Sequence, residues 1–136
     1  MTRARTLARE LALQSLYQMD LRGGDAPPPL PEDADEESRA YARELIAGVK
    51  ERDAELVGTL KTLVEHWSWE RIAAVDRCIL KIGAFELLHA PGIPPKVALD
   101  EAIELAKRYS TKESGAFVNG ILDRLYQKSK GQAASS

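Results

Sequence analysis

The stretch VDRCILKIGAFELLH, residues 75–89, decides the fold. Its apolar residues fall on almost every side of a helix, and a helix that is apolar all round is buried at the centre of a protein. Within it, Gly83 disfavours the helix by roughly 1 kcal/mol relative to alanine, which predicts that a neighbouring helix crosses close to it. Glu86 on so apolar a helix needs a partner when it is buried, so we expect a structural ion pair or a cap.

An amphipathic helix is predicted upstream of this segment, from Arg5 to Leu21, with Arg5 and Arg9 on a shared face. Its expected buried face is a stripe at helical spacing, formed by Leu13, Leu16, Tyr17 and Leu21. A glycine pair ends this helix, and the proline-rich run 27–31 cannot be helical. An acidic stretch then favours a helix start near Glu36, because carboxylates oppose the positive end of the helix dipole. A break near Asp53 separates this helix from the next one.

Two further helices are predicted downstream of the central one. Pro95 suits the first position of a helix, where its missing N–H is not needed, and this helix runs to Tyr109. The residues Ser110-Thr111-Lys112-Glu113 fit a capping box, in which the Ser110 oxygen accepts a hydrogen bond from the Glu113 N–H. A last helix therefore begins there, and the chain is predicted to be all-α, with about seven helices and no convincing strand.

Size and composition are those of one ordinary globular domain. Of the 136 residues, we expect 1–130 to form this domain and 131–136 to be a flexible tail. The sequence is 44% hydrophobic and 29% charged, which argues against intrinsic disorder. No apolar run approaches the roughly 20 residues that span a bilayer, and the N-terminus lacks the features of a signal peptide. A cytoplasmic protein is therefore expected.

The residue inventory argues against metal and catalytic sites. The lone cysteine, Cys78, can form no internal disulfide. Together with the two histidines of the sequence it is too small a set of nitrogen and sulfur ligands for a zinc site. The sequence contains no glycine-rich cofactor loop after a strand and no nucleophile motif of a hydrolase. We therefore expect no metal, no cofactor and no catalytic residue.

Two features could belong to a nucleic-acid-binding protein. Basic residues are concentrated at residues 1–22 and 107–130, and the rest of the chain carries a net negative charge, although the net charge of the whole sequence is only −2. A solvated helix face is the ordinary interpretation, but the two clusters would merge into one phosphate-binding patch if the first and last helices lay side by side. Trp67 and Trp69 could stack on bases, yet burial at a corner between helices is commoner, and we expect core packing.

Several segments carry a resemblance to a known family. They are IPPKVALDEAIELAK at residues 93–107, FVNGILD at 117–123, the central segment 75–88, and ARELALQSLY at 8–17. Together they closely resemble NusB, a bacterial family of transcription antitermination factors. The resemblance implies a seven-helix fold of two small bundles that share one core. It also implies a protein that pairs with NusE, a small-subunit ribosomal protein, to bind boxA RNA and assist ribosomal RNA transcription in the antitermination complex of RNA polymerase.

The resemblance also implies which residues make these contacts. The RNA contacts fall on the first helix and on the start of the last one, at Arg3, Arg5, Arg9, Tyr17, Lys112, Ser114 and Phe117. Lys112 and free helix N–H groups suit phosphate, and an exposed Phe117 could stack on a base, although it could equally belong to the core. The NusE contact is placed around the central helix, at Glu70, Asp76 and Arg77. A homodimer through a related surface is a further expectation.

Two other classes of protein are alternatives. RNA cytosine methyltransferases carry a NusB-like domain at their N-terminus, so the chain could be a part of an enzyme, but its own residues supply no catalytic motif. A NusB-like helical adaptor that binds RNA or protein, with no role in antitermination, is the other alternative. Salt distinguishes an adaptor that binds only protein, because RNA binding through several phosphates weakens steeply as the salt concentration rises.

Overall fold

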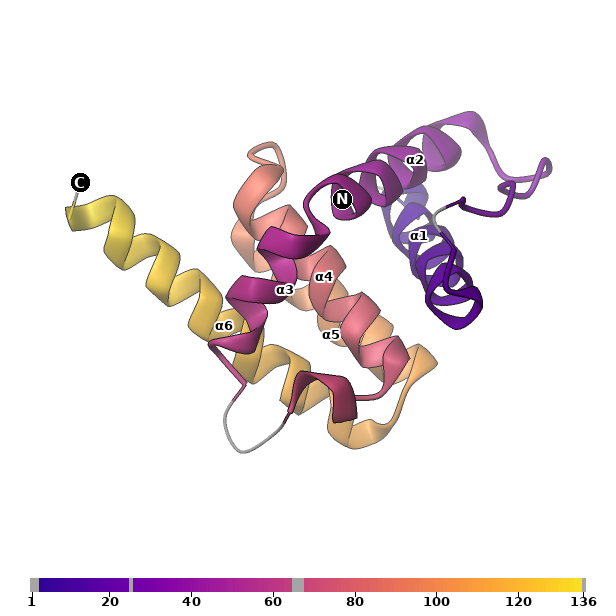
Figure 1. Cartoon of the computed structure of the whole chain (residues 1–136). Coiled ribbons are helices and arrows are strands. Elements are labelled where there is room, and N and C mark those ends of the chain that lie inside the picture. Colours follow the sequence, from indigo (N-terminus) through magenta and orange to yellow (C-terminus); the bar gives the residue numbers. More distant parts are fainter. Residues whose placement is uncertain (1–2, 25, 65–67, 136) are drawn as a thin grey trace.

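Helix α4 (Ala74–His89) lies at the centre of the structure, as its apolar sequence predicts (Figure 1). The structure, a computed structural model, describes residues 3–24, 26–64 and 68–135, with residues 132–135 described by their backbone only. Within this part of the chain α4 contacts each of the other α-helices, and its residues Ile79, Leu80 and Ala84 are fully buried. The central helix is therefore shared by both halves of the fold.

Six α-helices and one short 3-10 turn make up the described chain, in which no strand occurs. They are α1 (Arg3–Arg22), α2 (Glu36–Glu51), α3 (Asp53–Lys61), the 3-10 turn η1 (Trp69–Arg71), α4, α5 (Pro95–Tyr109) and α6 (Lys112–Ser135). Helix α1 pairs with α2, while α4, α5 and α6 pack together and α3 packs on α4. One continuous hydrophobic core joins the two groups. The predicted all-α fold, two small bundles that share one core, is confirmed.

The helix ends follow local rules that the sequence already contains. The Asp35 carboxylate caps α2 by accepting a hydrogen bond from the Ser38 N–H at 2.8 Å, and this bond lowers the pKa of Asp35. Helix α1 ends at Arg22 and is followed by Gly23, whose φ of 70° lies in the left-handed region that favours glycine. Pro95 is the first residue of α5. Helix α6 continues to Ser135, past the expected domain end at residue 130, and the flexibility of residues 131–136 stays a prediction.

The cap of α6 differs from the prediction by one residue. Thr111 Oγ1, rather than Ser110, accepts a hydrogen bond from the Ser114 N–H at 3.2 Å, and Ser114 Oγ accepts one from the Thr111 N–H at 3.4 Å. Ser114 thus takes the place predicted for Glu113. The run of polar residues allows this motif to form either between Ser110 and Glu113 or between Thr111 and Ser114. The Ser114 hydroxyl also donates to Asp76 at 3.0 Å, which favours the second pair.

The buried face of α1 also differs from the predicted stripe. Leu16 is buried as expected, but Tyr17 is 37% exposed and Leu21 is 65% exposed. The centre of the buried face is formed instead by Ala8 and Ala12, which are fully buried. Small side chains let neighbouring helices approach closely, so α2 and α4 pack on this side beside the buried Leu13 and Leu16, whereas Tyr17 and Leu21 are left partly exposed.

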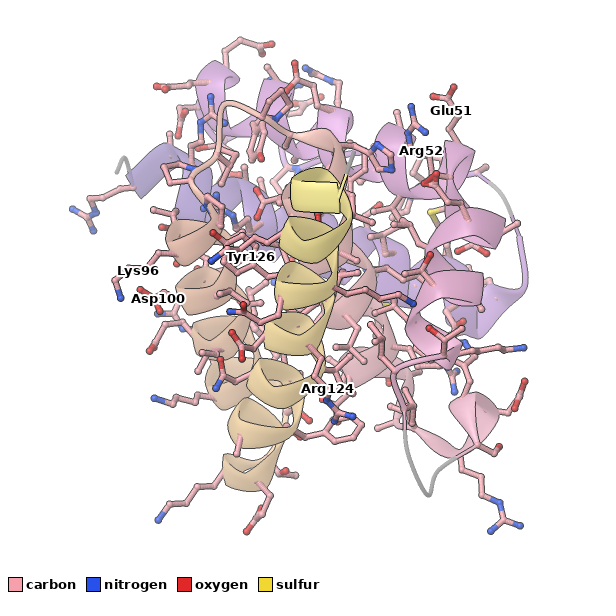
Figure 2. All side chains as sticks on the ribbon, turned by 90° about the vertical axis from the view of Figure 1, so that its left-hand side faces the viewer. Glu51, Arg52, Lys96, Asp100, Arg124 and Tyr126 are labelled. Atoms are coloured by element: carbon pink, nitrogen blue, oxygen red, sulfur yellow. The ribbon has the colours of Figure 1, made fainter. Side chains whose placement is uncertain are left out.

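The two basic ends of the chain are not joined by neighbouring helices. Helix α1 packs on α2 and α4, whereas α6 packs on α5 and α4 (Figure 1), so among the described residues the side-by-side arrangement of α1 and α6 that would merge the two basic clusters does not occur. Basic residues of α6 make local contacts: Arg124 Nε donates to the Gly120 carbonyl at 3.3 Å, and Lys130 Nζ lies 5.3 Å from the Tyr126 ring centroid. Figure 2 shows Arg124 and Tyr126 on this helix. These contacts fit a solvated helix face.

Trp69 packs into the core, as predicted. It is 8% exposed at the start of η1, where the chain turns toward α4. It is therefore unavailable for stacking on bases. Trp67, for which core packing was also predicted, lies outside the described residues.

Gly83 marks a close helix crossing, as predicted. A Cβ at this position would lie 2.5 Å from Leu122 Cδ1 of α6 and 3.4 Å from the Ala102 Cβ of α5. The sequence did not single out a second crossing, where Gly48 of α2 faces Phe85 of α4. A Cβ at Gly48 would lie 2.3 Å from Cζ of the Phe85 ring. These two glycines therefore set how closely α2, α5 and α6 approach the central helix.

Replacing Gly48 by alanine is expected to lower the free energy of unfolding by about 1–3 kcal/mol, because the ring of Phe85 must be displaced from a packed interface. Thermal melting measures the effect. The matched control is Gly58→Ala in α3, where a Cβ meets nothing within 4 Å. That control should melt at or slightly above the wild-type temperature, since alanine favours a helix by roughly 1 kcal/mol over glycine. Equal melting of the two variants would contradict the prediction.

Candidate nucleic-acid interface

A concavity where α6 begins beside α4 gathers three of the residues singled out from the sequence. Its volume is about 300 Å³, and we call it the Asp76 pocket. It is lined by Arg71, Ile72, Ala73, Asp76, Thr111, Glu113, Ser114 and Phe117. The sequence assigns Asp76 to the NusE contact and assigns Ser114 and Phe117 to RNA. The structure therefore brings residues of both predicted contacts to one place.

Asp76 is the chemically unusual residue of this pocket. It is 7% exposed, and its Oδ2 accepts a hydrogen bond from Ser114 Oγ at 3.0 Å. Its Oδ1 has no hydrogen-bond partner among the described residues. A buried oxygen without a donor is costly to the folded state. An N–H or O–H group of an incoming molecule would satisfy it, so Asp76 suits a contact with a hydrogen-bond donor.

Ser114 lies in the same pocket but its hydroxyl is already used. The residue is 6% exposed, and besides Asp76 its Oγ lies 2.9 Å from both Ser110 Oγ and Thr111 Oγ1. A hydroxyl so enclosed holds Asp76 and the start of α6 in place. The direct RNA contact predicted for Ser114 is therefore wrong, because the resemblance could not show that this position points inward.

Replacing Ser114 by alanine is expected to lower the free energy of unfolding by about 1–3 kcal/mol, because the buried Asp76 carboxylate loses its only hydrogen-bond donor among the described residues. Denaturant unfolding followed by circular dichroism measures this. Ser68→Ala is the matched control, since among the described residues its exposed hydroxyl bonds only the exposed Glu70 carboxylate at 3.1 Å. The control should change stability by no more than about 0.5 kcal/mol. A Ser114 variant as stable as the control would show that Asp76 is solvated.

Phe117 and Lys112 are accessible at the start of α6. Phe117 is half-buried: it packs partly against the core and also lines the Asp76 pocket, and base stacking by its ring stays a prediction. Lys112 is exposed and is the first residue of α6. The N-terminus of a helix attracts anions through its free N–H groups. This end of α6 is therefore suited to phosphate and an unpaired base.

Arg9 is not a surface residue, and the RNA contact predicted for it is wrong. It is 1% exposed, and its Nε lies 2.9 Å and 3.0 Å from the two carboxylate oxygens of Glu86. Its Nη1 donates to Glu101 Oε1 at 2.9 Å. The Tyr41 hydroxyl also donates to Glu86, and burial together with this carboxylate raises the pKa of Tyr41. The ion pair expected for Glu86 is thereby confirmed, with Arg9 as its partner.

Arg3 and Arg5 lie at the N-terminal end of α1 and are more accessible than Arg9. Arg3 is exposed, and Arg5 is half-buried with its guanidinium carbon 4.3 Å from the ring centroid of Tyr41. At 3.6 residues per turn, Arg3 and Tyr17 fall on the same outward face of α1. This face therefore carries a cation at one end and a partly exposed aromatic ring toward the other.

The other two residues assigned to the NusE contact differ in availability. Glu70 is exposed and pairs with Lys61 Nζ at 3.4 Å. Arg77 is half-buried and donates to the Ile72 carbonyl at 2.7 Å, while its Nη2 lies 3.4 Å from Asp20 Oδ2 of α1. Arg77 therefore holds the turn before α4 in place against α4 and α1. Of the two residues, Glu70 is the one whose charge is accessible to a partner.

A polar seam between α1 and α5 was not predicted from the sequence. Glu10 accepts hydrogen bonds from Arg108 at 2.5 Å and from the Tyr109 hydroxyl at 2.6 Å. Burial and the bond to Glu10 raise the pKa of Tyr109. The Gln14 amide also reaches the Tyr109 hydroxyl at 3.5 Å. The seam brings the end of α5, and with it the loop into α6, beside the outward face of α1.

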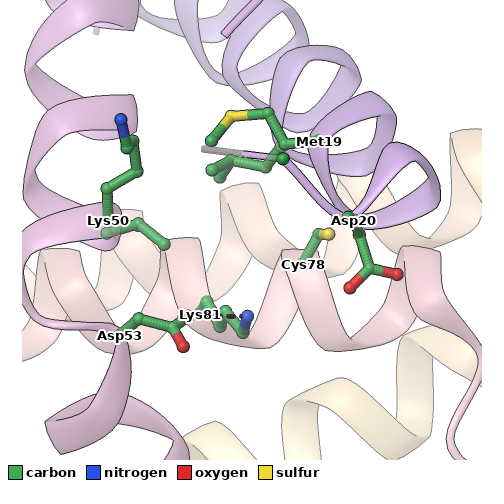
Figure 3. A pocket seen from close by; sticks show the side chains of 10 residues that line it. Met19, Asp20, Lys50, Asp53, Cys78 and Lys81 are labelled. Atoms are coloured by element: carbon green, nitrogen blue, oxygen red, sulfur yellow. Dashed lines mark ion pairs between the residues drawn. The ribbon is translucent and has the colours of Figure 1, made fainter. Parts of the chain in front are cut away.

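A separate concavity between α1, α2 and α4 carries several charges, of which Lys81 and Asp53 are paired with each other (Figure 3). Its volume is about 320 Å³. Lys81 Nζ lies 2.7 Å from Asp53 Oδ1, and burial raises the pKa of the Cys78 thiol to about 11, so this cysteine stays protonated and unreactive at neutral pH. Among the described residues no group of three or more His, Cys, Asp or Glu side chains is placed to hold a metal ion.

The sequence model of the NusB family matches residues 6–127, which is most of the chain. The chain belongs to the NusB family. The transcription antitermination protein NusB of Sorangium cellulosum is 46% identical over 127 residues, covering 90% of this chain and 91% of that protein. The NusB protein of Symbiobacterium thermophilum is 39% identical over 145 residues, covering 97% and 95%. In the described part of the chain, no helix is long and apolar enough to cross a membrane.

Solved NusB structures share the fold. The structure of T. maritima NusB superposes with a TM-score of 0.83 at 37% sequence identity, covering 93% of each chain. A chain in the crystal structure of antitermination factors NusB and NusE in complex with dsRNA superposes with a TM-score of 0.79 at 27% identity. That match covers 94% of this chain and 99% of the other. The elements that form this NusB-family fold are therefore present here from end to end.

Proposed function

We propose that this NusB-family chain is a transcription antitermination factor that binds boxA RNA of ribosomal RNA operons together with NusE, in the antitermination complex of RNA polymerase. The observation that carries the proposal is the family match over residues 6–127. The likeness to a chain of the NusB–NusE–dsRNA crystal structure, over 94% of this chain, supports it. The surface of the chain offers chemistry for both partners.

The RNA contacts are proposed on two stretches of surface. Arg3 and Arg5 supply cations at the start of α1, and Lys112 with the N-terminus of α6 supplies a second phosphate site. Phe117, at the Asp76 pocket, offers a ring to an unpaired base. Tyr17 lies on the face of Arg3, roughly 20 Å away at 1.5 Å per residue. Such a spacing suits a strand of RNA that runs along the protein rather than one phosphate group.

The NusE contact is proposed at Asp76 and Glu70. Asp76 Oδ1, which has no hydrogen-bond partner among the described residues, would accept a hydrogen bond from a donor group of NusE, and the exposed Glu70 would attract a cation. Arg77 supports this surface from within by holding η1 and α1 against α4. Homodimer formation stays a prediction, which sedimentation of the purified chain at several concentrations tests.

The test of this function is a titration of labelled boxA RNA and of a scrambled RNA with the chain, alone and with NusE, at two salt concentrations. We expect tighter binding of boxA RNA, further tightening with NusE, and a steep loss of affinity as salt rises. Equal affinity for both RNAs under every condition would contradict the proposal. An adaptor that binds only protein predicts a complex with NusE that forms without any RNA binding.

A further inference from the structure

Tyr41 of α2 occupies an unusual place beneath the cationic end of α1. It is 9% exposed, its hydroxyl donates to Glu86 of α4, and its ring faces two arginines of α1. The guanidinium carbon of Arg5 lies 4.3 Å from the ring centroid, and that of Arg9 lies 5.8 Å from it. One aromatic ring thus contacts a buried arginine and an accessible one, a single helical turn apart.

The ring of Tyr41 is fixed from below. Its acceptor Glu86 is 1% exposed and is itself held by Arg9 Nε through both carboxylate oxygens, at 2.9 Å and 3.0 Å. Glu101 of α5 completes the set by accepting from Arg9 Nη1 at 2.9 Å. Three helices besides α2 therefore determine where this ring lies, and it has no freedom to follow Arg5 if that side chain moves.

A fixed ring restricts the guanidinium that stacks on it. A guanidinium on an aromatic face is held with its plane defined, and its N–H groups lie in that plane, where they suit the two oxygens of a phosphate. An arginine without such a support is ordered only when the phosphate arrives, and the lost side-chain entropy weakens binding. Arg5 differs in this way from Arg3, which is exposed.

We propose that Tyr41 is a positioning residue for RNA binding, whose ring holds the Arg5 guanidinium in the orientation that binds a phosphate of the RNA. The inference rests on the proposed function, because it requires that Arg5 meets RNA. Tyr41 itself is buried and acts only through Arg5.

The test compares Tyr41→Phe, Tyr41→Leu and Arg5→Ala in the affinity for labelled single-stranded boxA RNA and in melting temperature. Tyr41→Phe keeps the ring but removes the hydrogen bond to Glu86, so it should melt lower yet bind RNA within about twofold of wild type. Tyr41→Leu removes the ring, so we expect roughly two- to fivefold weaker binding. In the Arg5→Ala background the same Leu substitution should cause no further loss.

Two outcomes would overturn this role of Tyr41. One is a Leu variant that weakens binding equally with and without Arg5, and the other is a Phe variant as weak as the Leu variant. If Tyr41→Leu does not fold, Arg5→Lys decides, because it keeps the charge without the planar group: we expect about two- to fivefold weaker binding, and unchanged binding would refute the role.

This test separates failure of the positioning role from failure of the proposed function. A chain that binds boxA and scrambled RNA equally fails as an antitermination factor, yet the coupling between Tyr41 and Arg5 can still be measured on either RNA. A wild-type chain that binds no RNA overturns both.

Discussion

Replacing Arg9 by methionine is expected to lower the free energy of unfolding by about 3–5 kcal/mol and the melting temperature by roughly 10–20 °C. Arg9 and Glu86 are each 1% exposed, and Arg9 also pairs with Glu101 at 2.9 Å. Without the guanidinium, the Glu86 carboxylate is left buried with the Tyr41 hydroxyl as its one remaining donor in the described part of the chain. A buried charge without a counter-charge is among the most damaging changes a fold can suffer.

The matched controls for this change lie on the same helix and in the same cluster. Arg3→Met removes an exposed arginine of α1 and should leave melting within about 2 °C of wild type. Adding Glu86→Gln to the Arg9 variant removes the uncompensated charge and keeps an acceptor for Tyr41, so part of the stability should return. An Arg9 variant that melts like the Arg3 control would show that the cluster is solvated.

Replacing Arg3 and Arg5 together by alanine is expected to weaken binding of boxA RNA at least about tenfold, because each hydrogen bond to a charged group contributes about 1.5–3 kcal/mol. The plot of log affinity against log salt should become shallower by about 1.4, since each phosphate contact with single-stranded RNA contributes about 0.7. Fluorescence anisotropy at several salt concentrations measures both quantities. The melting temperature should change by only a few degrees.

Lys96→Ala is the control for this second change. Lys96 is an exposed cation at the start of α5, 3.4 Å from Asp100, and Figure 2 shows the two side chains at the surface. Its removal lowers the net charge of the chain without touching the proposed RNA surface, so the affinity should stay within about twofold. Equal losses in the two variants would mean that RNA responds to overall charge and not to the end of α1.

The central helix could be predicted from the sequence because a helix with apolar residues on almost every side is stable only when it is buried in the core. The same pattern showed that Glu86 needs a partner and that Gly83 sits at a crossing. It could not show which arginine pairs with Glu86. Helical spacing places Arg5 and Arg9 on one face. Because arginines are mostly exposed, the sequence predicts that this face is exposed to solvent. In the structure it turns toward Tyr41, and only Arg5 stays partly accessible.

The candidate site was predictable in its segments but not in its side chains. The start of α6 was located correctly, yet the cap moved to Thr111 and Ser114 because neighbouring polar residues fit the same motif in two registers. The juxtaposition of Asp76 with Phe117 depends on how α6 packs on α4, which no local pattern contains. The seam of Glu10 with Arg108 likewise joins residues far apart in sequence, and no single pair stands out among so many charges.

Transcriptional read-through on a boxA template is the most direct measurement of the function. A cell extract depleted of this protein would transcribe a template with boxA upstream of a terminator, and a matched template with scrambled boxA. Adding the purified chain back should raise read-through on the boxA template alone, and the variant lacking Arg3 and Arg5 should restore much less. Restored read-through on both templates, or on neither, would contradict its role as a boxA-dependent antitermination factor.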